Sequence, residues 1–185
     1  MKKSVLLTQG AIIAAVYFVL TLLVAPLAFG PLQFRVSEAL MVLPMFTIAA
    51  VPGLFVGCLL FNLLYPTGLG PIDVIFGSLA TLIAAVLIYW LGRRMNPELP
   101  QLKFTNLKTW ISPLPAVISN GLIVGGYLLF LLPDVDQVTV PAVLGNMLSI
   151  AVCEAVVVYT IGLAILFILK QSKTFLRLCG YTVSV

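Results

Sequence analysis

The chain has 185 residues, of which 62% are hydrophobic and 9% charged, and its mean hydropathy is +1.18. Soluble domains carry about 25% charged residues, so this composition excludes a water-soluble globule and indicates an integral membrane protein. The net charge of +4 does not indicate nucleic-acid binding, because the basic residues flank apolar segments. The sequence contains no histidine and its three cysteines are scattered, so neither a metal site nor a disulfide framework is expected.

The apolar runs predict six membrane-spanning helices, each of which needs about 20 apolar residues if it crosses upright. The first run ends at Phe29-Gly30-Pro31, where proline lacks a backbone donor and glycine favours a turn. The stretch from Ala39 to Tyr65 is broken at Val51-Pro52-Gly53, which favours two short helices joined by a tight turn. The polar segment from Met95 to Ser112 is expected to be a loop. The predicted fold is a single all-α membrane domain, residues 1–185, with helices at about 8–28, 38–50, 53–65, 72–92, 113–132 and 140–170.

The basic residues predict the orientation of this bundle. An even number of helices puts both ends of the chain on one side, and cytoplasmic loops carry an excess of Lys and Arg. Of the ten basic residues, all except Arg35 fall on the side of the termini. They are Lys2, Lys3, Arg93, Arg94, Lys103, Lys108, Lys170, Lys173 and Arg177. We therefore expect both termini to be cytoplasmic.

Polar residues inside the predicted helices are candidates for a binding site, because such groups are costly in a membrane and usually face a cavity or a partner. Glu154 lies near the middle of the sixth helix with no neighbouring Lys or Arg. We interpret it as a ligand or proton site; the alternative is a protonated carboxyl that hydrogen-bonds another helix. Asn120 and Asn146 either contact a ligand or join helices.

Three of the charged residues toward the outer side are further candidates for the site. Arg35 and Glu38 are three residues apart in the first outer loop, where they could simply pair at the surface. Asp73 begins the fourth helix, where the helix dipole favours a carboxylate, and Thr81 lies on the same stripe. Together with the buried polar groups, these residues describe a pocket that is reached from outside.

Small residues mark two helix faces. Gly53 and Gly57 are four apart on the third helix and allow close approach of a neighbouring backbone. Ala11 and Ala15 form a flat face near the cytoplasmic end of the first helix, which ordinary helix packing explains equally well.

Several of these segments resemble the QueT family of substrate-binding (S) components of energy-coupling factor (ECF) transporters. The resemblance implies a six-helix bundle with both termini inside that captures a queuosine precursor, which is a 7-deazaguanine base. It also implies a multi-pass protein of the plasma membrane, with Ala11 and Ala15 contacting a transmembrane coupling (T) subunit and with two cytoplasmic ATPases as further partners. It implies no cofactor. The segments that carry it are residues 30–39, 52–58 and 73–81, the region of Asn120, and Glu154.

Given that resemblance, the polar residues can be assigned roles. A 7-deazaguanine presents a ring N–H and an exocyclic amine side by side, a donor pair that the Glu154 carboxylate can accept, with Asn120 at the carbonyl edge. Asp73 or Glu38 would meet any aminomethyl ammonium. Phe34 would stack on the ring and the loop with Arg35 would act as a lid. The predicted substrate-binding residues are Phe34, Arg35, Glu38, Asp73, Thr81, Asn120, Asn146 and Glu154.

Other functions remain open from the residues alone. An S component for another vitamin, such as riboflavin or thiamin, would have the same architecture. A nucleotide-binding loop of the Gly-x-x-x-x-Gly-Lys-Ser/Thr type is absent from the sequence, so an importer of this kind needs partner subunits for energy, unless the chain is an autonomous proton-coupled carrier. An intramembrane enzyme could use Asp73 and Glu154 as a carboxylate pair. Against it stand the missing histidine and the absence of a Gly-x-Ser-x-Gly motif.

Overall fold

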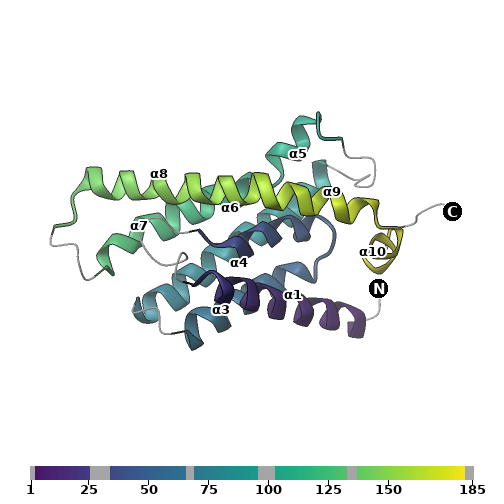
Figure 1. Cartoon of the computed structure of the whole chain (residues 1–185), viewed down its shortest axis with the longest axis horizontal. Helices are drawn as coiled ribbons and strands as arrows, with labels where there is room; N and C mark the ends of the chain where they lie inside the picture. The colour runs from purple at the N-terminus through teal and green to yellow at the C-terminus, as the bar shows by residue number, and fades with distance from the viewer. Residues whose placement is uncertain (1–2, 26–33, 66–68, 96–102, 133–136, 182–185) are drawn as a thin grey trace.

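A computed structural model describes residues 3–25, 34–65, 69–95, 103–132 and 137–181. All regular structure within these ranges is helical and forms an elongated bundle (Figure 1). Two 3-10 helices, η1 and η4, and two π-helical turns, η3 and η5, interrupt the α-helices. The elements are α1 (Lys3–Leu23), η1 (Val36–Met45), α3 (Ala50–Leu64), α4 (Gly70–Met95), α5 (Leu107–Ile111), α6 (Leu114–Ser119), η3 (Asn120–Val124), α7 (Gly125–Tyr127), η4 (Leu128–Phe130), α8 (Val140–Val157), η5 (Val158–Gly162), α9 (Leu163–Gln171) and α10 (Lys173–Leu178).

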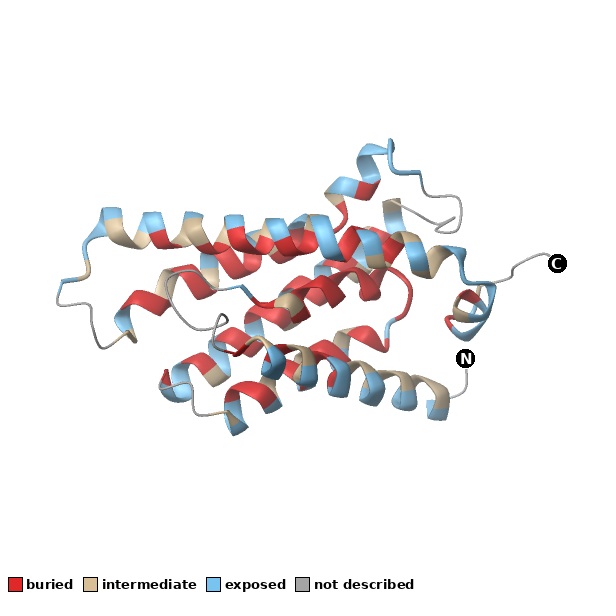
Figure 2. Ribbon diagram, in the orientation of Figure 1, coloured by how far each residue is buried: buried red, intermediate tan, exposed pale blue. Residues whose placement is uncertain are grey.

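Four helical runs are long and apolar enough to cross a membrane: Lys3–Leu23, Gly70–Met95, Leu107–Phe130 and Val140–Gln171. The predicted second and third helices correspond to η1 and α3, which are apolar but shorter than a full span. Figure 2 shows buried residues in the middle of the bundle and exposed ones on the outer faces of α1 and α8. Those outer faces carry large apolar side chains such as Ile12 and Leu148, as expected of a surface that contacts lipid.

The break between the second and third helices lies at residues 46–49, and not at Val51-Pro52-Gly53 as the sequence predicted. Proline is tolerated in the first turn of a helix, because its missing N–H would have no intrahelical partner there. Pro52 therefore lies inside α3, which begins at Ala50. The preceding element, η1, contains Pro44 and is a 3-10 helix.

Two other predicted boundaries differ from the structure. The first helix begins at Lys3, earlier than predicted, and its predicted last residues, 26–28, lie outside the described residues. Part of the predicted loop after α4 is helical, because the Asn106 side chain accepts a hydrogen bond from the Lys108 backbone and caps α5. The helical run that contains α6 thus begins at Leu107.

The start of α1 and the short helix α10 lie at the same end of the bundle (Figure 1). Gln9 Nε2 donates to the Leu178 carbonyl oxygen at 2.8 Å and joins the two. The main apolar core lies toward this end and includes Met41, Met45, Phe46, Leu166 and Leu176. The location of α1's start and α10 at one end agrees with the prediction that both ends of the chain lie on one side. Which side of the membrane this is stays a prediction.

Glycines let α3 lie directly against α1. A Cβ atom at Gly57 would lie 2.8 Å from the Ala14 carbonyl oxygen, and one at Gly53 would lie 2.8 Å from the Gly10 carbonyl oxygen. The small face predicted on the third helix is therefore confirmed as a close backbone contact. This contact fixes the position of the buried face of α1, which carries Tyr17.

Candidate functional site

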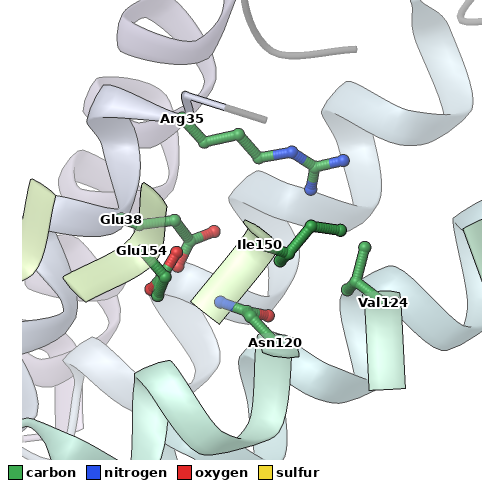
Figure 3. A pocket seen from close by; sticks show the side chains of 6 residues that line it. All are labelled: Arg35, Glu38, Asn120, Val124, Ile150 and Glu154. Carbon is green, nitrogen blue, oxygen red and sulfur yellow. The ribbon is translucent and has the colours of Figure 1, made fainter. Parts of the chain in front are cut away.

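A small cavity lies between η1, η3 and α8 (Figure 3). Its volume is about 10 Å³, which is room for about one water molecule. Four of the predicted site residues meet there although they are far apart in the sequence. The lining residues are Arg35, Glu38, Asn120, Val124, Ile150 and Glu154.

The backbone explains how these side chains converge. Arg35 has an extended conformation, with φ of −97° and ψ of 95°, and its side chain reaches over the cavity from the start of η1 (Figure 3). Asn120 is the first residue of the π-helical turn η3, a type of distortion that is frequent at functional sites. Glu154 lies in the last part of α8, just before the second π-helical turn, η5.

Two carboxyl groups from different helices meet at this cavity. Figure 3 shows the Glu38 and Glu154 side chains beside each other, and both are buried. The Asn120 side chain lines the same cavity as both carboxyls (Figure 3). Within the described ranges, Glu38 Oε2 and Glu154 Oε1 have no hydrogen-bond donor. Because burial of a polar atom without a partner is unfavourable, these two oxygens are available acceptors for a ligand.

Tyr17 is a neighbour of this pair that sequence reasoning missed. Its hydroxyl donates to Glu38 Oε1 at 2.5 Å, and the side chain is buried. One turn later, the hydroxyls of Thr21 and Ser37 are hydrogen-bonded at 2.7 Å. The signal in the sequence was a pair of hydroxyl side chains four residues apart, and so on one face, in an apolar helix.

A second polar cluster adjoins the cavity at Arg35. The distance from Arg35 Nη2 to Asp73 Oδ1 is 4.0 Å, and Tyr127 donates its hydroxyl to the same oxygen at 2.6 Å. Arg35 and Glu38 are both buried, so the simple explanation of a surface ion pair between them does not hold. Asp73 is behind Arg35 and does not line the cavity itself.

Three other predicted residues do not line the cavity either. Thr81 Oγ1 lies 3.4 Å from Cys58 Sγ and 3.3 Å from the Gly77 carbonyl oxygen. Asn146 Nδ2 donates to the Gly125 carbonyl oxygen at 2.8 Å and thereby joins α8 to α7. Phe34 is 38% exposed. Two lining residues, Val124 and Ile150, could not be recognised in advance because an apolar residue carries no signal in a chain of this composition.

Ala11 and Ala15 are both exposed on α1, while Ala14 and Tyr17 are buried. The small face predicted to contact a partner is therefore not used for packing within the described bundle. Among the described residues, no group of three or more His, Cys, Asp or Glu side chains could hold a metal ion.

Comparison with known proteins identifies the family. The sequence profile of the QueT transporter family matches residues 7–171, a range that includes every residue lining the cavity. The chain belongs to the QueT transporter family. This family is one of transporters and not of enzymes, and with its several apolar helices the chain is a multi-pass protein of the plasma membrane.

One relative of this QueT-family chain is the "Queuosine precursor transporter QueT" of Lactococcus lactis subsp. cremoris (strain MG1363). The two sequences are 39% identical over 75 residues, which are 40% of this chain and 43% of the relative. The match therefore spans less than half of either protein. No solved structure matches the chain.

Proposed function

We propose that this QueT-family transporter captures a queuosine precursor, a 7-deazaguanine base, in the cavity between η1, η3 and α8. One observation carries the proposal: Glu38 Oε2 and Glu154 Oε1 are buried at the same cavity without a donor among the described residues. Such a pair calls for a ligand rich in N–H donors, and a guanine-type edge has adjacent donors. The name of the Lactococcus relative supports the same substrate class.

In this proposal Glu154 accepts the ring N–H and the exocyclic amine, and charge-assisted hydrogen bonds of this kind are the strong ones. The Asn120 amide, which lines the same cavity, donates one N–H to the carbonyl of the base. Glu38 Oε2 accepts a further donor, such as an aminomethyl ammonium where the precursor carries one. Asp73 stays with Arg35 and Tyr127.

The site must open before a base can enter, because ligand cavities are usually about 300–1,000 Å³ and this one has about 10 Å³. We assign the opening to the segment with Arg35, whose backbone is extended and not yet part of a helix. Arg35 reaches over the cavity, so a movement of this segment would uncover the other lining residues (Figure 3). Phe34, next to it, can then stack on the ring.

Binding of 7-aminomethyl-7-deazaguanine to the detergent-purified protein, measured by calorimetry, tests the proposal. We expect Glu154→Gln to weaken binding by about a hundredfold or more, because an N–H donor replaces one acceptor oxygen and the remaining hydrogen bond loses its charge. Glu98→Gln, the same chemical change in the polar segment after the fourth predicted helix, is the matched control and should bind like the unsubstituted protein. Equal affinity of Glu154→Gln and Glu98→Gln would contradict the proposal.

Selectivity separates this function from the other transport substrates. The analogue without the exocyclic amine should bind more weakly than the guanine-type base, and Glu154→Gln should lose this discrimination. Riboflavin and thiamin serve as competitors from the other vitamin classes. A bound ligand raises apparent stability by mass action, so thermal stabilisation by one of these vitamins in place of the 7-deazaguanine would identify a different S component.

We also propose that the chain is an S component that works with a coupling T subunit and two ATPases. Exposure of Ala11 and Ala15 on α1 supports a docking face there, since small residues allow a partner helix to approach closely. Ala11→Leu with Ala15→Leu should abolish co-purification of the ATPase module, whereas Val16→Leu, at an exposed position on another face of α1, should not. Uptake by the chain alone would instead indicate an autonomous carrier.

A further inference from the structure

We propose that Tyr17 is a positioning residue for ligand capture, which holds Glu38 so that one of its oxygens faces the cavity. This inference rests on the proposed function. The Tyr17 hydroxyl donates to Glu38 Oε1 at 2.5 Å. The other oxygen, Oε2, has no hydrogen-bond partner within the part of the chain that the structure describes. One Glu38 oxygen thus accepts a hydrogen bond from the protein, and the other is left to accept one from a ligand.

The structure fixes Tyr17 from several directions. Its side chain is 1% exposed, and a Cβ atom at Gly57 would lie 2.9 Å from the Tyr17 Cβ, so α3 lies directly against it. Thr21 Oγ1 donates to the Tyr17 carbonyl oxygen at 2.8 Å and accepts a hydrogen bond from Ser37 Oγ at 2.7 Å. Since Ser37 precedes Glu38 in η1, α1 holds both the backbone and the side chain of the binding carboxyl.

A packing role alone would not require the hydroxyl. Phenylalanine would fill nearly the same space on the buried face of α1, and a tyrosine hydroxyl can use a backbone carbonyl instead, as the partly exposed Tyr159 does with Trp110 at 2.7 Å. Tyr17 instead donates to a carboxyl that lines the cavity. Without this donor, Glu38 could rotate to place both oxygens near Asn120 and Arg35, and its preorganised acceptor would be lost.

Tyr17→Phe tests the inference, with 7-aminomethyl-7-deazaguanine as the probe. We expect its affinity to fall by about tenfold, because an acceptor that is no longer held must be ordered on binding. Tyr159→Phe also removes one hydroxyl hydrogen bond, but away from the cavity, and should bind normally. If the unsubstituted protein does not bind the probe, the proposed function fails and this inference fails with it. If the unsubstituted protein and Tyr17→Phe bind equally well, this inference alone fails.

A double-mutant cycle distinguishes positioning from a general loss of packing. If Tyr17 acts through Glu38, Tyr17→Phe should have little further effect on affinity in a Glu38→Gln background, whereas independent effects would be additive. Infrared spectra of the empty protein give a second readout. The carboxyl band that disappears in Glu38→Gln should shift in Tyr17→Phe and stay in place in Tyr159→Phe. Additive affinities, or an unshifted band, would overturn the inference.

Discussion

The cavity and the apolar core are built from the same helices but differ in whether their buried polar atoms have partners. In η1, Glu38 lies at the cavity while Met41 and Met45 lie in the core. The run through α8 and α9 similarly carries Glu154 at the cavity and Leu166 in the core. The core side chains are apolar and closely packed, whereas the cavity retains acceptors with no donor in the described chain. The comparison indicates that one part of each helix stabilises the fold by apolar packing. The other part keeps buried acceptor oxygens whose missing hydrogen bonds a ligand can supply.

The largest effect on stability is expected from truncation of a large side chain in the apolar core. Phe46 is fully buried and meets Phe175 edge to face, with ring centroids 5.2 Å apart. Phe46→Ala should lower the free energy of unfolding by about 3–5 kcal/mol, measured by denaturation in detergent. Phe130→Ala, at a side chain 65% exposed, should change it by less than about 0.5 kcal/mol. If ligand affinity falls in Phe46→Ala as much as stability does, the two regions do not act separately.

An apolar residue in the cavity should have the opposite effect on stability. Glu154→Met keeps a similar volume but removes a buried oxygen that has no donor in the described ranges. We expect the empty protein to gain about 1–3 kcal/mol of unfolding free energy while ligand binding is lost. Thermal denaturation without ligand, with Glu154→Gln as the polar comparison, measures this gain. A loss of stability would instead support the alternative that Glu154 is a structural link between helices.

The sequence predicted the polar part of the site better than its walls or its backbone. Charges and amides stand out in an apolar chain, so Arg35, Glu38, Asn120 and Glu154 could be recognised, and the structure brings all four to one cavity. The role of Tyr17 depends on the side of α1 that faces η1, which periodicity does not reveal when the whole helix is apolar.

The backbone irregularities could not be predicted because tertiary contacts select them. The π-helical turn η3 is followed by Gly125, where a Cβ atom would lie 2.6 Å from the Met147 Cα. Such close approach of two helices depends on residues far apart in the sequence. The helix break was misplaced for a simpler reason: proline marks both helix ends and first turns, and Pro52 occupies a first turn.

The smallest expected effect concerns Asn146, which the sequence assigned to the binding site but which lies outside the cavity lining. Asn146→Ala removes its hydrogen bond to the Gly125 carbonyl oxygen, and such bonds between membrane helices contribute about 0.6 kcal/mol on average and up to about 1.7 kcal/mol. We expect a loss of stability in this range with ligand affinity within about twofold of normal. Asn120→Ala is the matched comparison, because the same truncation at the cavity should weaken binding. A large affinity loss in Asn146→Ala would extend the site toward α7, since Asn146 Oδ1 has no partner among the described residues and could then face the ligand once the cavity opens.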